Sequence, residues 1–364
     1  MTIKNVLNVL EEIAPPFLQE SYDNTGLLIG SSNAGVTGVL ITLDITGKVL
    51  EEAIKKNCNL IVSHHPVIFK GLKSITGKNF TERIVAGAIK NDIALYAIHT
   101  NLDNVDIGVN SILCDKLGLI NRKILAPKNE LLRKLVTFCP VDDAEKVRQA
   151  IFRAGAGNIG NYDSCSFNTP GKGTFRGSNE ANPYVGEKDK LHYENETRIE
   201  TIYPVYLEKQ VLNALFTAHP YEEVAYDIYL LGNEFSKVGA GMLGELEEEM
   251  ETLQFLKKVK EITNIPCIKH SELISNKVKK VAVCGGSGSF LIKDAIGSGA
   301  DVFVTGDVKY HDFFEAEDKI IIADIGHYES EQFAKELIYN VLNKKFSTFA
   351  VLISENNTNS VNYL

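Results

Sequence analysis

Strands alternate with helices at both ends of the chain, and this alternation constrains the fold more than any other feature of the sequence. Near the start, apolar runs at Gly38–Asp44, Asn59–His65 and Ile93–Asp103 predict three strands, the last of which runs into a polar loop. Helical patterns separate them at residues 45–59 and 81–92, where apolar residues recur at intervals of three and four. Such an alternation is typical of an α/β architecture.

The last third of the chain repeats this order. Strands are predicted at Lys279–Gly286, at Asp301–Asp307 and in Lys319–Glu331, where the strand runs into polar residues, and a helix is predicted at residues 289–300 between the first two strands. The runs NLIVSHH and DVFVTGD line up, because each lies about 20 residues after the preceding strand. The third strands line up as well, since each carries a histidine four residues before a carboxylate. We interpret this as a diverged internal duplication, with two related α/β halves facing each other.

The middle of the chain has a different order. Strands are predicted at 135–141, 162–169, 196–207 and 223–231, and helices at 142–157 and 208–219. A loop rich in Gly, Asn and Pro is expected at 170–190, and AHPYEE (218–223) is expected as a helix end and turn. The order β-α-β-β-α-β is that of a ferredoxin-like α+β module. We therefore predict a core of residues 1–127 and 234–364, interrupted by an inserted domain at 128–233. An acidic linker and a helix restart the core near residue 244.

The bulk composition narrows the class of protein. The 364 residues suffice for two or three domains, and no apolar run approaches the length of a membrane span. The net charge of −9 disfavours a broad nucleic-acid surface. The N-terminal pattern lacks a basic start followed by an apolar block, so no signal peptide is expected. The six cysteines are scattered and form no C-x-x-C pair, which favours reduced thiols in a cytoplasmic protein.

Polar side chains gather at the predicted strand ends, where α/β sheets bind ligands. The adjacent pair His64 and His65 stands at one such end, before Pro66. Taken alone, two adjacent histidines are usually surface or core residues that bind no ligand. A second pair, His327 and Glu331, would share one face of a helix after Gly326, and alone it would be an ordinary exposed pair. Their joint placement in both halves, together with Asp103, favours a metal site.

The ligand types favour two ions. Three histidines and two carboxylates suit zinc, iron or manganese. Five side chains are too many for one catalytic zinc, which uses three and keeps a position open. They suit a pair of ions that share a carboxylate, and we expect Asp103 to bridge, because a loop residue can reach both. Such a pair can polarise a carbonyl, an imidazole ring carbon or a phosphoryl group.

Weaker signals surround these residues. His311 is a candidate general acid near the metals or an ordinary polar residue, and Asp307 is a supporting partner or a cap. Asp44 and Thr46 have the same two interpretations. His99 either supports Asp103 or packs in the core. The run CGGSGS (284–289) could hold a phosphate on backbone amides or serve as a tight helix entry.

Four motifs, SHHP, HTNLD, TGDVKYHDFFEA and DIGHYESE, resemble in that order the family of GTP cyclohydrolase 1 type 2 homologs, also called the NGG-interacting-factor-like (Nif3-like) family. The segment APPFLQESYDNTGLLIG is similar too, with Tyr22 in place of the usual tryptophan. GNIGNYDSCSF and AHPYEEVAYDIYLL resemble the PII/CutA-like insert of the longer bacterial members.

This resemblance implies a Nif3-like core with a dinuclear centre of divalent ions, zinc first and iron or manganese as alternatives. The implied ligands are those already reached: His64, His65, Asp103, His327 and Glu331. It also implies a homohexamer, a hollow toroid with the metal sites facing its interior and the inserts over its openings.

Three functions are compatible with these residues. The first is a metal-dependent hydrolase, in which a metal-bound hydroxide opens the guanine imidazole ring of GTP and His311 or Asp307 shuttles protons. A broader phosphoester or amide hydrolase would use the same ions. The second is a metal-binding regulatory or metal-trafficking protein without catalysis, favoured by the insert. The third is a scaffold with structural histidines. A small-molecule substrate, in the first case a nucleotide, and no membrane are expected.

Overall fold

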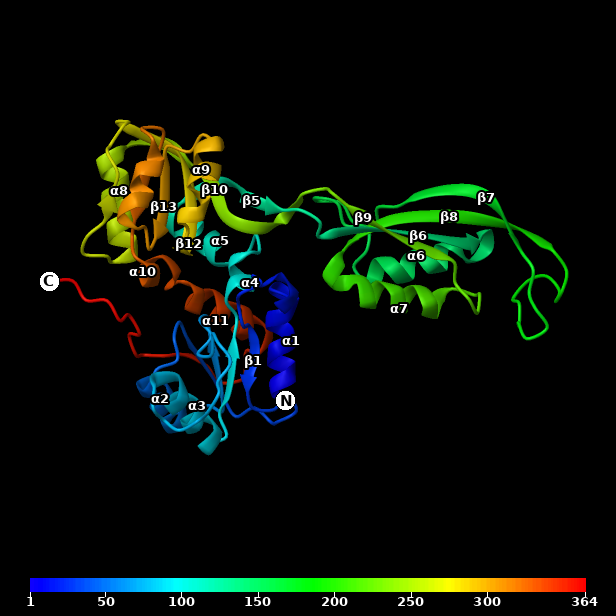
Figure 1. Cartoon of the computed structure of the whole chain (residues 1–364), viewed down its shortest axis with the longest axis horizontal. Coiled ribbons are helices and arrows are strands. Elements are labelled where there is room, and N and C mark those ends of the chain that lie inside the picture. Colours follow the sequence, from blue (N-terminus) through cyan, green and yellow to red (C-terminus); the bar gives the residue numbers. More distant parts are fainter. The chain divides into compact units, whose positions relative to one another are not determined.

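The computed structural model describes residues 1–364 and divides into two compact units. The first combines Met1–Pro127 with Ser236–Leu364, and the second is the intervening segment Lys128–Phe235. Figure 1 shows the elements of each unit along the chain. No helix in the structure is both long enough and apolar enough to span a membrane.

The first sheet of the larger unit has five strands in the order β1-β4-β3-β2-β15. Its parallel part consists of β2, β3, β4 and β15, while β1 pairs antiparallel to β4. Every residue of β2, β3 and β4 is buried, as expected for parallel strands covered on both faces. The bounds are β1 Gly26–Ile29, β2 Val39–Thr42, β3 Leu60–Ser63, β4 Ala94–Ala97 and β15 Val351–Ile353, with helices α2 Gly47–Lys55 and α3 Phe80–Lys90.

The second sheet has six strands in the order β11-β14-β13-β12-β10-β5. Its centre, β12-β13-β14, is parallel and runs in the same order as β2-β3-β4. The bounds are β5 Leu119–Lys128, β10 Phe235–Glu251, β11 Lys269–His270, β12 Lys277–Ser287, β13 Val302–Gly306 and β14 Ile321–Asp324, with helices α8 Thr252–Thr263 and α9 Ile292–Gly297. The prediction of an acidic linker near residue 244 is wrong, because residues 244–251 form the end of β10, which pairs with β12.

The remaining helices of this unit pack around the two sheets. The contacts of α11 with α1 and α5 join segments from both ends of the chain. Their bounds are α1 Ile3–Ile13, α4 Thr100–Asp103, α5 Val109–Leu117, α10 His327–Glu331 and α11 Ala334–Lys345, with 3-10 helices at Pro16–Leu18, Ser289–Leu291 and Tyr310–Ala316.

The smaller unit is a four-stranded antiparallel sheet in the order β7-β8-β6-β9, with two helices on one face (Figure 1). Its elements follow the chain as β6 Leu132–Pro140, α6 Ala144–Arg153, β7 Phe167–Phe175, β8 His192–Pro204, α7 Glu208–Ala218 and β9 Tyr226–Leu231, with 3-10 turns at Val141–Asp143 and Val205–Leu207. Leu135, Val147, Ile199 and Leu215 are fully buried in its own core.

One prediction fails in the smaller unit. The loop expected from residue 170 begins later, because β7 runs through Pro170, Gly171 and Gly173. An edge strand tolerates proline, since its missing N–H faces away from the ladder. Glycine-rich composition therefore predicted a loop where β8 holds the segment as a strand.

Candidate metal centre

The adjacent histidines lie directly beyond β3, where the backbone still pairs with the neighbouring strand. The His64 and His65 amides donate to the carbonyls of Thr42 and Leu43, at 3.2 and 3.0 Å. The His64 side chain is completely buried and His65 is nearly so. The pair is therefore held by the sheet and does not belong to a flexible surface loop.

The residues from the second half lie on a short helix after β14. Gly326 has φ +80°, a left-handed conformation that glycine adopts without strain, and it turns the chain from the strand into α10. His327 and Glu331 begin and end this helix, so they occupy one face, as the spacing predicts. Glu331 is buried, whereas part of His327 is exposed.

These residues meet the first-half histidines at the carboxyl ends of the parallel strands of the two sheets. Glu331 Oε2 lies 2.9 Å from His65 Nε2 and 3.1 Å from His327 Nε2. The two Nε2 atoms are 3.2 Å apart. His65, His327 and Glu331 thus form one group whose ligand atoms lie within 4.8 Å of one another and could hold an ion.

A second group of the same kind lies beside the first. His64 Nε2 is 3.6 Å from Asp103 Oδ1 and 3.8 Å from Glu331 Oε1. His64, Asp103 and Glu331 again lie within 4.8 Å of one another. Glu331 belongs to both groups through its two oxygens, whereas Asp103 belongs to one. An ion held in each group would therefore have Glu331 in common, whereas our expectation was that Asp103 would bridge; α4 holds Asp103 on the His64 side.

The donor atoms fit metal ions. His64 Nε2 and Asp103 Oδ1 are buried and have no hydrogen-bond partner, a costly arrangement unless an ion or water satisfies them. His64 Nδ1 donates to the Ile98 carbonyl at 2.8 Å, so its unprotonated Nε2 faces Asp103. Metal-binding histidines are commonly oriented in this way through their other ring nitrogen.

Carboxylates orient the other two histidines. His65 Nδ1 lies 2.8 Å from Asp44 Oδ1, and His327 Nδ1 lies 2.7 Å from Asp307 Oδ2. Thr358, near the end of the chain, donates to the second oxygen of Asp44 at 3.0 Å. The sequence left open whether Asp44 and Asp307 support other residues or cap helices. In the structure, each of them contacts and orients a histidine ring.

Without ions, the charges of the centre depend on each other. Burial lowers the pKa of His65, but hydrogen bonds with Asp44 and Glu331 outweigh burial and raise it to about 10. Burial and the Glu331 charge raise the pKa of Asp103 to about 8. For Glu331, burial acts upward, yet hydrogen bonds from His327 and His65 hold its pKa well below the usual value. A bound cation would replace the protons that now balance these carboxylates.

A fourth histidine also faces the centre. His99 precedes α4, and its ring lies about 5 Å from the rings of His64 and His65, measured between centroids. Its Nδ1 lies 2.8 Å from Asp23 Oδ1, and Thr100 holds the other Asp23 oxygen. His64, His65 and His99 form a third group whose nitrogens could hold an ion. The sequence analysis named His99 but left its role open. It did not identify Asp23 as a partner, because 76 residues separate Asp23 from His99.

The CGGSGS run lies against the centre. Gly286 has φ +65°, and a Cβ atom there would collide with the Glu331 carboxylate. The amides of Gly285 and Gly286 donate to Asn110 Oδ1 and Ser330 Oγ, both at 2.9 Å. Because the chain itself uses these two amides, they are not available to a phosphate. The glycines instead make room for a predicted ligand.

His311 is not among these groups. It is exposed on the 3-10 turn Tyr310–Ala316, where its ring stacks on Phe314 with 6.3 Å between centroids. The structure therefore brings together Asp307 and the five predicted ligands and leaves His311 on the surface beside aromatic residues.

The sequence and the fold have close counterparts. A family model described as Duf34/NIF3 (NGG1p interacting factor 3) matches residues 1–360. A protein of Halalkalibacterium halodurans named GTP cyclohydrolase 1 type 2 homolog is 41% identical over 96% of both chains. A Bacillus subtilis protein with the same name is 38% identical and covers 99% of this chain and 98% of its own. The crystal structure of a Bacillus cereus protein related to NIF3 is 40% identical, with a TM-score of 0.88 over 100% of this chain and 99% of that chain. The chain belongs to the Duf34/NIF3 family.

Proposed function

We propose that this chain binds two divalent metal ions at the carboxyl ends of the parallel strands in the two sheets of its larger unit. The proposal rests on one observation: two groups of ligand atoms lie side by side and share the two oxygens of Glu331. The proposed ligands are His64, His65, Asp103, His327 and Glu331. Imidazole nitrogens combined with carboxylates favour zinc, with iron or manganese as alternatives.

We further propose that the centre belongs to a metal-dependent hydrolase. Paired divalent ions polarise a bound substrate and activate water for attack. The chain itself supplies burial and orientation. Ile98, Asp44 and Asp307 each hold one histidine through Nδ1, so that the Nε2 atoms point to a common region. The names of the relatives favour a guanine nucleotide as substrate and opening of its imidazole ring as the reaction.

Two residues were expected to move protons. Because Asp307 is held at His327 Nδ1, we assign it a positioning role for that ring. His311 is exposed and makes no hydrogen bond to the chain, so it stays our candidate for proton transfer.

A second candidate function is a metal-binding regulatory or trafficking protein without catalysis. The separate core of the smaller unit favours it, since that unit adds nothing to the ligand set. We propose that the unit is a ferredoxin-like, PII/CutA-like insert at residues 128–233, supported by its strand order. The proposed assembly is a homohexamer, which sedimentation analysis would test.

The deciding experiment measures metal content per chain and GTP turnover on the same samples of the wild type, His65→Ala and Asp103→Ala. His270→Ala is the matched control, because His270 is exposed and lies outside all three groups. We expect about two ions in the wild type and the control, and loss of at least one in each ligand variant.

The two functions then separate. Turnover that disappears together with the ions supports the hydrolase, and metal without turnover favours the regulatory or trafficking protein. Full metal content in both ligand variants would show that these histidines and carboxylates are structural.

A further inference from the structure

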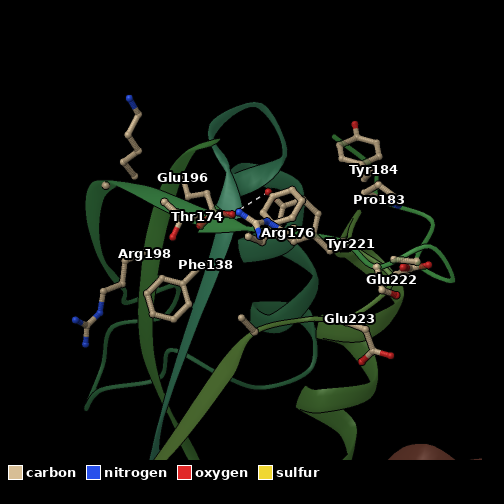
Figure 2. Close-up of a pocket in the computed structure, with 18 of the residues that line it drawn as sticks. Phe138, Thr174, Arg176, Pro183, Tyr184, Glu196, Arg198, Tyr221, Glu222 and Glu223 are labelled. Atoms are coloured by element: carbon tan, nitrogen blue, oxygen red, sulfur yellow. Dashed lines mark hydrogen bonds between the residues drawn. The ribbon is translucent and has the colours of Figure 1, made fainter. Parts of the chain in front are cut away.

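The smaller unit contains a pocket of about 780 Å³, which lies within the size range of small-molecule sites. All of its lining residues fall between Phe138 and Ala225, so the unit builds it alone (Figure 2). The candidate metal ligands all belong to the other unit. The pocket is therefore a separate site in the sequence and in the fold.

The pocket lies on the face of the sheet that its helices leave open. Thr169, Arg198 and Phe138 are opposite one another across β7, β8 and β6, so their side chains share a face. The buried core residues Cys139 and Ile199 occupy the alternating positions and face the helices. The antiparallel sheet thus uses one face for stability and keeps the other available.

Glycines in the edge strand keep this space open. Glycine weakens a strand and often marks the close approach of a ligand or backbone. At Gly173 a Cβ atom would collide with the buried Glu196 carboxylate. At Gly171 the nearest atom to a Cβ would be the Glu196 carbonyl oxygen at 4.0 Å, so packing against the chain does not demand glycine there. A side chain at 171 would occupy the pocket.

Aromatic rings form the walls. Phe175 and Tyr184 lie 6.0 and 6.3 Å from Tyr221, measured between ring centroids, and Phe138 lines the same space. His219 fixes this arrangement, since its Nε2 donates to the Phe138 carbonyl at 2.9 Å and its Nδ1 accepts the Tyr221 amide at 3.1 Å. Such walls favour a flat ring, which can stack on them.

Among the three cations that line the pocket, only Arg176 lacks a partner. Arg198 pairs with Glu200 at 3.0 Å, and Lys172 lies over the Tyr193 ring. Arg176 makes no hydrogen bond or ion pair, and Figure 2 shows it at the centre of the pocket, whereas Arg198 points away. A guanidinium in this position favours a carboxylate or phosphate, which it can hold with two hydrogen bonds.

The carboxylates of the pocket are mostly engaged. Glu196 accepts the Tyr221 hydroxyl at 2.8 Å, and Glu222 accepts the Asn182 amide at 2.7 Å. Glu223 is exposed at the edge of the pocket (Figure 2). The second oxygen of Glu196 remains available for an N–H or O–H donor on the ring of a ligand.

We propose that this pocket binds a small anion that carries a flat ring, with the ring between the aromatic walls and the anionic group on Arg176. Nucleotides and aromatic carboxylates share this chemistry. The site requires no metal and does not depend on the activity of the other unit.

Because the chain has no tryptophan, Tyr184→Trp would place a single fluorescent reporter at the pocket. The full-length protein is titrated with GMP, AMP and indole-3-acetate, and with guanosine, adenosine and inorganic phosphate as incomplete probes. We expect a probe with both ring and anion to bind at least about tenfold more tightly than its incomplete counterparts, since each lacks one set of contacts. Nucleotide binding without indole-3-acetate binding identifies a phosphate ligand, and the reverse identifies a carboxylate.

Two variants in the Tyr184→Trp background locate the binding. Arg176→Met removes the charge and should weaken binding at least about tenfold, while Arg153→Met, an exposed arginine outside the pocket, should not. Gly171→Leu should abolish binding by filling the space. Gly232→Leu is its control, because a Cβ atom there also meets open space outside the pocket.

Failure of all three complete probes to bind would overturn the proposal, as would equal binding to Arg176→Met. Sedimentation of the same variants supplies a further check. If no probe binds and Gly171→Leu instead disrupts self-association, the pocket is an interface between copies of the chain.

Discussion

The two units of this protein use their sheets in different ways. In the larger unit, the central parallel strands are buried on both faces, and the candidate metal centre lies beyond their carboxyl ends. In the smaller unit, the antiparallel sheet buries one face under helices and presents the other to a pocket. A sheet covered on both sides can offer side chains only at its ends, whereas a sheet covered on one side can also offer a face.

The two sites also differ in how far apart in the sequence their residues lie. The candidate metal centre joins His65 to Glu331, 266 residues apart, and is assembled only when both halves fold. The pocket is built from fewer than 100 residues of one unit. Substitutions that alter the packing between the two halves of the larger unit should therefore disturb the candidate metal centre. Substitutions in the smaller unit should affect only its own pocket.

The largest effect is expected for Glu331→Gln. This change weakens the shared ligand of both groups, so metal content should fall from about two ions per chain to nearly none. Asp103→Ala removes a ligand from one group and should leave about one ion. Elemental analysis of both proteins after dialysis decides this. Equal metal content in the two variants would argue against Glu331 as the bridge.

A smaller loss is expected for Gly286→Ala. The added Cβ collides with the Glu331 carboxylate and also strains a backbone with φ +65°, at a cost of about 1–3 kcal/mol. The metal content and the midpoint temperature of thermal unfolding should both decrease. Gly297→Ala serves as the control, because a Cβ atom there meets open space in α9. A normal metal content in Gly286→Ala would show that the centre can shift to accommodate a side chain.

The third prediction concerns acid sensitivity of the core unit. Burial alone would raise the pKa of Glu52, but hydrogen bonds from Lys56, Ser354 and Asn356 outweigh it and lower the pKa to about 2. A lowered pKa stabilises the folded state above the usual value of 4.5, and this contribution is lost as the pH falls toward 2.

Glu52→Gln should therefore cost on the order of 2 kcal/mol at pH 7 and progressively less toward pH 2.5. Urea unfolding of the wild type and variant at several pH values measures the difference. The exposed Glu317, whose partner Lys319 is also exposed, provides the control Glu317→Gln, with an effect near zero. A difference that does not change with pH would exclude the carboxylate charge as its source.

The smallest effect is expected for Thr358→Ala. It removes the hydrogen bond to Asp44 Oδ2, and Asp44 in turn contacts His65, one of the proposed metal ligands. Metal affinity at the His65 side should weaken about two- to fivefold, less than the loss of a direct orienting partner. Competition with a metal-binding dye measures this affinity. An unchanged affinity would mean that the end of the chain does not help to fix Asp44.

The sequence predicted the mixed α/β order, the core strands and the element order of the insert, because apolar periodicity is local. It placed His64 and His65 at the end of a strand, whereas β3 stops at Ser63, and it put His327 and Glu331 on one face of a helix. It mistook residues 244–251 for a linker and residues 170–175 for a loop, since acidic or glycine-rich composition can be strand when a neighbouring strand supplies the hydrogen bonds.

The sequence by itself therefore determined which residue types stand at the strand ends, because a local pattern of apolar and polar residues specifies where each strand stops. Only the tertiary structure decided which atoms meet. The shared position of Glu331, the contact of Asp23 with His99 and the glycine beside the Glu331 carboxylate all join residues separated by 45 positions or more. Such contacts depend on how the two sheets pack, and no periodicity within one segment carries that information.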